Sequence, residues 1–182
     1  MERQQIIASI LKARKGISQY LEIMEIFPQV DVSQDSDFQR KYNAFYRVRQ
    51  RSREWYKIYF SLMQQWKGQK PNFDQVIEHF NKSLGRYEPS FSSKLIATLD
   101  PEKPIWDVYV LSNTNHPAPA YYSKEKIEQA KVAYKSIQKW YQDFLSSDDG
   151  RLLISIFDEM VPEHAKITSL KKADFVLWQL RS

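Results

Sequence analysis

The residue in this sequence with the clearest chemical potential is an aspartate that follows a proline-bounded loop. Asp107 comes directly after Pro104-Ile105-Trp106, and the residues after it predict a short helix. An aspartate at a helix N-terminus accepts hydrogen bonds from backbone N–H groups, which keeps its carboxylate ionised and oriented. Such a carboxylate can stabilise a developing positive charge or activate an attacking water. The alternative interpretation is that Asp107 only caps the helix.

A basic segment with interspersed aromatic residues lies earlier in the chain. Between Arg40 and Lys57, seven Lys and Arg residues and five aromatic residues stand with a single acidic residue, Glu54. Cationic side chains neutralise phosphates and aromatic rings stack on bases, so this pattern predicts a groove for nucleic acid. It also fits a solvated surface whose aromatic residues point into the core. The residues we expect to contact nucleic acid are Arg47, Arg49, Arg51, Arg53, Tyr46 and Trp106. The alternative for Trp106 is a place in the core beside Asp107.

The segment from Gly85 to Val110 contains a turn, a short helix, a proline-bounded loop and the start of another helix. This order resembles the central part of the helix-hairpin-helix DNA glycosylases of base excision repair. In that superfamily a loop ends in a Pro-hydrophobic-Asp sequence, which Pro104-Ile105-Trp106-Asp107 matches here. The resemblance implies that Asp107 faces a pocket for an extruded base, where its carboxylate stabilises the positive charge that builds on the sugar.

The same resemblance makes Lys94 a candidate amine. Bifunctional members of the superfamily place a lysine at the start of the second hairpin helix, and here Ser92 and Ser93 occupy that place, directly before Lys94. The superfamily's hairpin also contains glycines that allow close approach to phosphate. Residues 87–92 of this chain contain no glycine and include Glu88, which we expect to repel a phosphate. The residue-level match covers 90–110, within a helical pattern that extends over 36–180.

Other catalytic and metal-binding signatures are missing from the sequence. It contains no Walker loop, no glycine-rich dinucleotide fingerprint and no HExxH pair. Its three histidines are His79, His116 and His164, and their spacing is not that of metal ligands. The absence of cysteine excludes disulfides, thiol nucleophiles and Cys-ligated metal clusters. We therefore expect no metal and no cofactor.

The spacing of apolar residues predicts an all-α protein that positions these groups. We expect helices over about 2–26 (or two helices joined near Gly16), 37–50, 53–66, 73–84, 90–99, 108–111, 123–147, 151–160 and 169–180. Ser52 should cap the third of these helices and Gly85 should end the fourth. Asp148-Asp149-Gly150 should end the seventh helix. No stretch alternates with period two, which argues against a sheet. We expect one domain over 1–182, in which the N-terminal helix packs on a glycosylase-like helical core over 36–180.

Composition limits the class of protein. The chain has 182 residues, of which 42% are hydrophobic, and its net charge is +5. That length and composition can bury one substantial core, and the charge is a mild bias towards anionic partners. The N-terminus has no apolar signal sequence, and no apolar run is long enough to span a bilayer. We expect a cytoplasmic protein without a membrane partner, and its oligomeric state stays open.

Two hypotheses about function follow. The first is a divergent DNA glycosylase-like protein that binds nucleic acid, with DNA as the expected partner, and acts on a base through Asp107 and Lys94. The second is a non-enzymatic helical interaction or defence-associated protein that keeps the scaffold without catalysis. The missing hairpin glycines favour the second hypothesis, and an open cavity that contains both Asp107 and Lys94 would favour the first.

Overall fold

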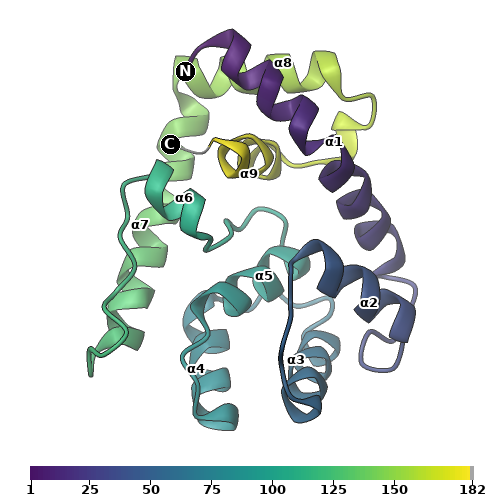
Figure 1. Ribbon diagram of the computed structural model, residues 1–182, viewed down its shortest axis with the longest axis vertical. Coiled ribbons are helices and arrows are strands. Elements are labelled where there is room, and N and C mark those ends of the chain that lie inside the picture. Colours follow the sequence, from purple (N-terminus) through teal and green to yellow (C-terminus); the bar gives the residue numbers. More distant parts are fainter. Residues whose placement is uncertain (181–182) are drawn as a thin grey trace.

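In the computed structural model, residues 1–180 are described, and they form nine α-helices and one short 3₁₀ helix with no strand (Figure 1). In chain order these are α1 (Arg3–Ile26), α2 (Ser36–Phe45), α3 (Arg53–Gln65), α4 (Phe73–Leu84), α5 (Pro89–Leu99), α6 (Val108–Asn113), α7 (Lys126–Ser146), α8 (Asp148–Met160), η1 (His164–Lys166) and α9 (Ser169–Gln179). The predicted all-α fold is confirmed. The last two residues of the predicted domain, 181 and 182, lie outside the described residues.

Helix α9 is the central helix of one half of the molecule. It packs against α1, α6, α7 and α8, and Figure 1 shows it seen nearly end-on with α1 and α8 above it. Every residue from Leu170 to Leu177 is buried, although this stretch contains two lysines and an aspartate. A helix buried on all sides is usually apolar all round. The charged residues of α9 therefore need partners within the protein.

Helix α1 is one continuous helix that passes through Gly16 without a break. Its apolar residues recur at spacings of three and four, and the buried face includes Ile6, Ile10, Ala13 and Ile17. Gly16 faces the rings of Phe45 and Phe175, and an added Cβ would lie 3.9 Å from each of them. Of the two alternatives that the sequence left open, the single helix is correct.

The other half of the molecule consists of α2 to α5, and Figure 1 shows α3 and α4 side by side below α5. Aromatic residues fill its core. The rings of Trp55 and Tyr59 stack at 4.7 Å, and the ring of Phe80 lies parallel to both, 5.6 Å from Tyr59 and 6.4 Å from Trp55. The hydroxyls of Tyr42 and Tyr59 are hydrogen-bonded at 2.8 Å, so this core also satisfies its polar groups. It gives α5 a rigid support.

Two predicted helix boundaries were wrong for identifiable reasons. Helix α2 ends at Phe45 rather than near residue 50, because Arg47 and Gln50 adopt left-handed backbone conformations (φ 54° and 56°) that no helix continues. The helical conformation is interrupted between α7 and α8 at Ser147, whose hydroxyl accepts a hydrogen bond from the Gly150 N–H at 3.1 Å. Gly150 thus lies in the first turn of α8. Two predicted caps, Ser52 of α3 and Gly85 of α4, are confirmed.

A search of the helices within residues 1–180 for membrane-spanning candidates finds none with the required length and hydropathy.

Candidate functional site

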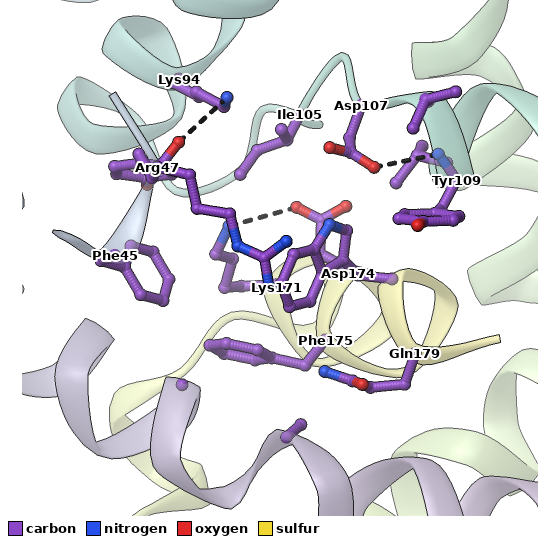
Figure 2. A pocket seen from close by; sticks show the side chains of 16 residues that line it. Phe45, Arg47, Lys94, Ile105, Asp107, Tyr109, Lys171, Asp174, Phe175 and Gln179 are labelled. Atoms are coloured by element: carbon purple, nitrogen blue, oxygen red, sulfur yellow. Dashed lines mark hydrogen bonds and ion pairs between the residues drawn. The ribbon is translucent and has the colours of Figure 1, made fainter. Parts of the chain in front are cut away.

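A cavity of about 340 Å³ lies where α5, α6, α9 and the segment after α2 meet (Figure 2). It contains both candidate catalytic residues, because Asp107 and Lys94 line it together. Arg47 from the basic segment lines it as well. Two residues selected through the glycosylase resemblance and one selected from the basic segment therefore meet at one site. The volume falls in the range of about 300–1,000 Å³ that is usual for small-molecule sites.

Asp107 is the N-cap of α6, and it also faces the cavity. One of its carboxylate oxygens, Oδ1, accepts a hydrogen bond from the Tyr109 N–H at 2.9 Å. Figure 2 shows its carboxylate above that of Asp174, which lines the same cavity, and the Asp107 side chain is half-buried. The two interpretations of Asp107 are thus compatible. The cap orients the carboxylate, and the remaining lone pairs stay available to a ligand.

The loop that carries Asp107 is anchored through its backbone carbonyls. The Tyr134 hydroxyl donates to the carbonyl oxygen of Pro104 at 2.8 Å, and the Thr168 hydroxyl donates to that of Pro101 at 2.9 Å. Tyr134 belongs to α7 and Thr168 caps α9, so two distant parts of the chain hold this loop. The position of Asp107 is therefore set by tertiary contacts as well as by its own helix.

Lys94 extends from α5 towards the cavity, and its ammonium group has one hydrogen-bond acceptor within residues 1–180. The Nζ atom donates to the Tyr46 carbonyl oxygen at 3.2 Å and lies 4.9 Å from the centre of the Phe91 ring. These contacts leave N–H groups of the ammonium free to reach a ligand. Figure 2 shows Lys94 and Asp107 on the same side of the cavity.

The surroundings of Lys94 favour its neutral amine. Burial is the largest cause and lowers the pKa of Lys94 below its usual value of 10.5, because desolvation disfavours the charged form. The carboxylate of Asp107 opposes this shift. Nearby cations reinforce it, and they belong to Arg47, Arg51 and Lys171. A desolvated lysine beside other cations is the environment in which enzymes use a lysine as a nucleophile.

Two further residues of the cavity, Lys171 and Asp174 of α9, were not among the predicted site residues. Their side chains form an ion pair at 3.3 Å, and both residues are almost fully buried, at 2% and 4% exposure. The hydroxyl of Tyr141 donates a hydrogen bond to Oδ1 of Asp174. Burial raises the pKa of the Asp174 carboxyl, and the charge of Lys171 opposes that increase. A sequence signal existed, since Lys171 and Asp174 are spaced to share one helix face, but helical charges at this spacing are usually solvated.

Aromatic side chains form the walls of the cavity. Phe45, Phe175 and Trp178 line it, and the guanidinium of Arg47 lies 4.7 Å from the centre of the Trp178 ring. Arg47 holds this place with a left-handed backbone, which is costly for a residue with a side chain. An exposed cation above an aromatic wall, at the margin of a polar cavity, suits an aromatic ligand with phosphate nearby.

The two aromatic residues predicted to contact nucleic acid are both buried. Trp106 is 4% exposed, and its ring is parallel to that of Phe73 at 6.0 Å. Its backbone N–H donates to the Ser93 hydroxyl at 2.8 Å. The placement of Trp106 on a binding surface was wrong, since it belongs to the core next to Asp107. Tyr46 is 6% exposed and borders the cavity, where its carbonyl oxygen binds Lys94.

The remaining arginines of the basic segment do not act as one surface. Arg49 and Arg53 are exposed, and neither has an ion-pair partner among the described residues. Arg51 is half-buried and lies 3.4 Å from Glu88, a residue that Arg86 also approaches at 3.8 Å. Glu88 is only 7% exposed. The charge of Glu88 is therefore buried and balanced by two arginines, which reduces the repulsion that we expected it to exert on a phosphate.

The chain matches no protein-family model, no curated protein and no solved structure. Within the described part of the chain, no group of three or more His, Asp or Glu side chains is arranged to hold a metal ion. The function must therefore be inferred from the geometry of the cavity.

Proposed function

We propose that this protein binds DNA, accommodates an extruded base in the cavity between α5, α6 and α9, and acts on the glycosidic bond of that nucleotide. The supporting observation is that Asp107 and Lys94, which the resemblance to helix-hairpin-helix glycosylases selected, line one cavity together with Arg47. An enzyme that acts on a base must take it out of the helical stack into such a pocket.

Asp107 would act on the sugar. When the bond between C1′ and the base nitrogen breaks, its electrons leave with the base and positive charge builds on the sugar. A carboxylate that is already oriented and poorly solvated stabilises that charge without reorganisation. The hydrogen bond from the Tyr109 N–H and the anchored loop supply this orientation. Attack of water at C1′, with loss of a proton, completes hydrolysis.

Lys94 would act on the product sugar. Its neutral amine adds to the C1′ aldehyde of the ring-opened abasic sugar and then loses water, which gives an imine. The amine must lose its proton first, and the lowered pKa of Lys94 increases the fraction in that form. Asp107 lines the same cavity and can accept the proton through water.

Borohydride capture on abasic-site DNA tests this proposal. Borohydride reduces an imine to a stable amine, so the wild-type protein should become covalently linked to an oligonucleotide with one abasic site. Lys94→Gln should abolish the linkage. The matched control is Lys139→Gln on α7, an exposed lysine that pairs with Asp143 and lies outside the cavity. Equal capture by wild type and Lys94→Gln would contradict the proposal.

One observation favours binding without cleavage as a second candidate function. The turn before α5, where glycosylase hairpins approach phosphate, begins α5 with Pro89 and holds Glu88 buried against Arg51. Such a turn favours a stable local structure over close approach of its backbone to a phosphate. If gel shifts detect binding to damaged, mismatched or single-stranded DNA while borohydride captures nothing, this candidate replaces the first.

A further inference from the structure

We propose that Lys171 and Asp174 recognise the edge of the bound base, and that they select bases with a ring carbonyl next to a ring N–H, with guanine the best fit. The inference rests on the proposed function, because it assumes that the cavity receives a base. It identifies the substrate class that the same cavity would accept.

The buried ion pair has unused hydrogen-bonding capacity. An ammonium has three donors and a carboxylate has about four acceptor positions. Among the described residues, Asp174 is the only hydrogen-bond partner of the Lys171 ammonium, and Tyr141 and Lys171 are the only donors to the Asp174 carboxylate. The remaining contacts of Lys171 are with aromatic rings, 5.3 Å from Tyr20 and 5.7 Å from Phe175. A ligand in the cavity can therefore bind both groups without breaking an existing bond.

A structural role alone explains this pair poorly. Removing two charges from water is costly, and buried ion pairs often stabilise a fold no better than apolar side chains of similar size. Yet Lys171 and Asp174 line the wall of a cavity, in a buried part of α9 where Lys172 is the one other charged residue. Groups placed in that way at a binding site usually provide orientation and specificity.

The charges in the cavity nearly balance, so an enclosed ligand group without net charge fits it better than a phosphate or carboxylate. Asp107 and Asp174 repel an anion, and the three cations that line the cavity offset their charge. The walls are aromatic, with Phe45, Phe175 and Trp178 positioned to contact a planar ring. The cavity thus suits a neutral aromatic heterocycle with a polar edge, while the phosphates stay outside near Arg47.

The arrangement of donor and acceptor favours some bases over others. An ammonium only donates and pairs well with a carbonyl oxygen, and a carboxylate only accepts and pairs with the N–H groups of a base. Guanine, hypoxanthine, uracil and thymine each present a carbonyl oxygen next to a ring N–H, and guanine adds the N2 amino group as a second donor to the carboxylate. Adenine and cytosine present an amino group in place of that carbonyl and an unprotonated ring nitrogen in place of that N–H. In the same orientation Lys171 would therefore meet a donor and Asp174 an acceptor.

Binding of free nucleosides tests the inference. Dissociation constants for guanosine, inosine, uridine, adenosine and cytidine are measured by ligand-observed NMR with the full chain. We expect guanosine to bind about tenfold or more tightly than adenosine, since a good bidentate pair discriminates by that much. Inosine and uridine should bind more tightly than adenosine and cytidine.

A change of preference separates recognition from simple loss of folding. Asp174→Asn replaces one carboxylate oxygen by an amide donor, which matches the second carbonyl of xanthine. This variant should lose its preference for guanosine and gain affinity for xanthosine. Lys172→Met is the matched control, because Lys172 is the neighbouring buried lysine of α9, pairs with Asp158 and does not line the cavity. It should keep the wild-type order of nucleosides.

The outcomes distinguish this inference from the proposed function. Equal binding of all nucleosides, tighter binding of adenosine, no detectable binding of any nucleoside, or an unchanged order in Asp174→Asn would each overturn the inference. Borohydride capture through Lys94 could still succeed in all these cases, and the proposed function would then stand alone. A preference for guanosine together with failed capture would support recognition and contradict the proposed chemistry.

Discussion

The cavity between α5, α6 and α9 and the surface hollow between α2 and α3 both gather charged residues, but they differ in burial and pairing. The cavity holds two carboxylates and two lysines, and the Lys171–Asp174 ion pair in its wall is almost fully buried. The hollow, of about 550 Å³, is lined by Arg40, Arg53 and Lys57. Arg53 and Lys57 are exposed and, in the described part of the chain, have no ion-pair partner.

Because of this difference, the two sites would contribute to ligand binding in different ways. Exposed unpaired cations bind phosphates of any sequence, and salt weakens that binding. Buried paired charges interact with a ligand only when its donors and acceptors match, and salt screens them much less. In the proposed function, the hollow would therefore provide affinity for nucleic acid and the cavity would provide specificity and chemistry.

The largest expected effect is on stability, and it contrasts two neighbouring lysines. Lys171→Met leaves the buried carboxylate of Asp174 without its cation, so the free energy of unfolding should fall by about 3 kcal/mol. Lys172→Met should cost only about 1 kcal/mol, because its partner Asp158 is one-third exposed. Chemical denaturation of both variants measures the difference, and equal losses would show that burial does not separate the two pairs.

The loss in Lys171→Met should also depend on pH. Burial raises the folded-state pKa of Asp174, and removal of the lysine charge raises it further. The folded state then binds a proton more tightly than the unfolded state. The stability that protonation of Asp174 gives the variant is therefore fully present below the unfolded-state pKa of 3.8. It decreases as pH rises through the folded-state pKa. We expect Lys171→Met to regain stability relative to wild type as pH falls towards 4.

The next effect is on catalysis. Asp107→Asn keeps a cap on α6, since Asn is as good an N-cap as Asp, but it removes the negative charge. Release of a base should slow by about a hundredfold in single-turnover reactions with duplexes that contain hypoxanthine or uracil. The affinity of the Asp107→Asn variant for DNA should depend on salt concentration in the same way as that of wild type. Unchanged cleavage would limit Asp107 to its role as a cap.

Borohydride capture should respond to pH in opposite directions in two cavity variants. Capture requires the neutral amine of Lys94, so it rises with pH through the lowered pKa of that residue. Asp107 raises this pKa and Arg47 lowers it. Asp107→Asn should therefore move the midpoint of the pH profile down, and Arg47→Gln should move it up. Shifts in the same direction would show that these residues do not act on Lys94 by charge.

The smallest effect is expected at the surface hollow. Arg53→Gln and Lys57→Gln should each reduce the slope of log affinity against log salt by about 1, and they should weaken binding to all sequences alike. Stability should change by less than about 0.5 kcal/mol, because both residues are exposed. Filter binding over a series of salt concentrations measures the slope. A change in base preference in either variant would contradict the division between hollow and cavity.

The sequence predicted the helices well, because local spacing and capping residues determine them. Ser52 and Gly85 define helix ends through their own chemistry, and the structure confirms both. The end of α2 could not be predicted, since nothing in the residue types of Arg47 and Gln50 favours a left-handed backbone. The surrounding packing overrides local preference there, and it places Arg47 over Trp178.

The candidate site was predicted in part. Asp107 and Lys94 were identified, and they meet in one cavity, because the loop and helix that carry them are local in sequence. Lys171 and Asp174 were missed because burial of a charged pair depends on the helices that surround α9, which lie far away in the chain. Trp106 was misplaced for the related reason that an aromatic residue beside a candidate carboxylate can face either the core or the ligand.

Mapping the site of the borohydride adduct tests the central claim most directly. The wild-type protein is captured on an abasic-site oligonucleotide, the complex is digested, and mass spectrometry identifies the modified lysine. We expect one dominant adduct, on Lys94. An adduct spread over exposed lysines such as Lys57, or the absence of any adduct, would contradict the claim that the cavity between α5, α6 and α9 receives the sugar of an extruded nucleotide.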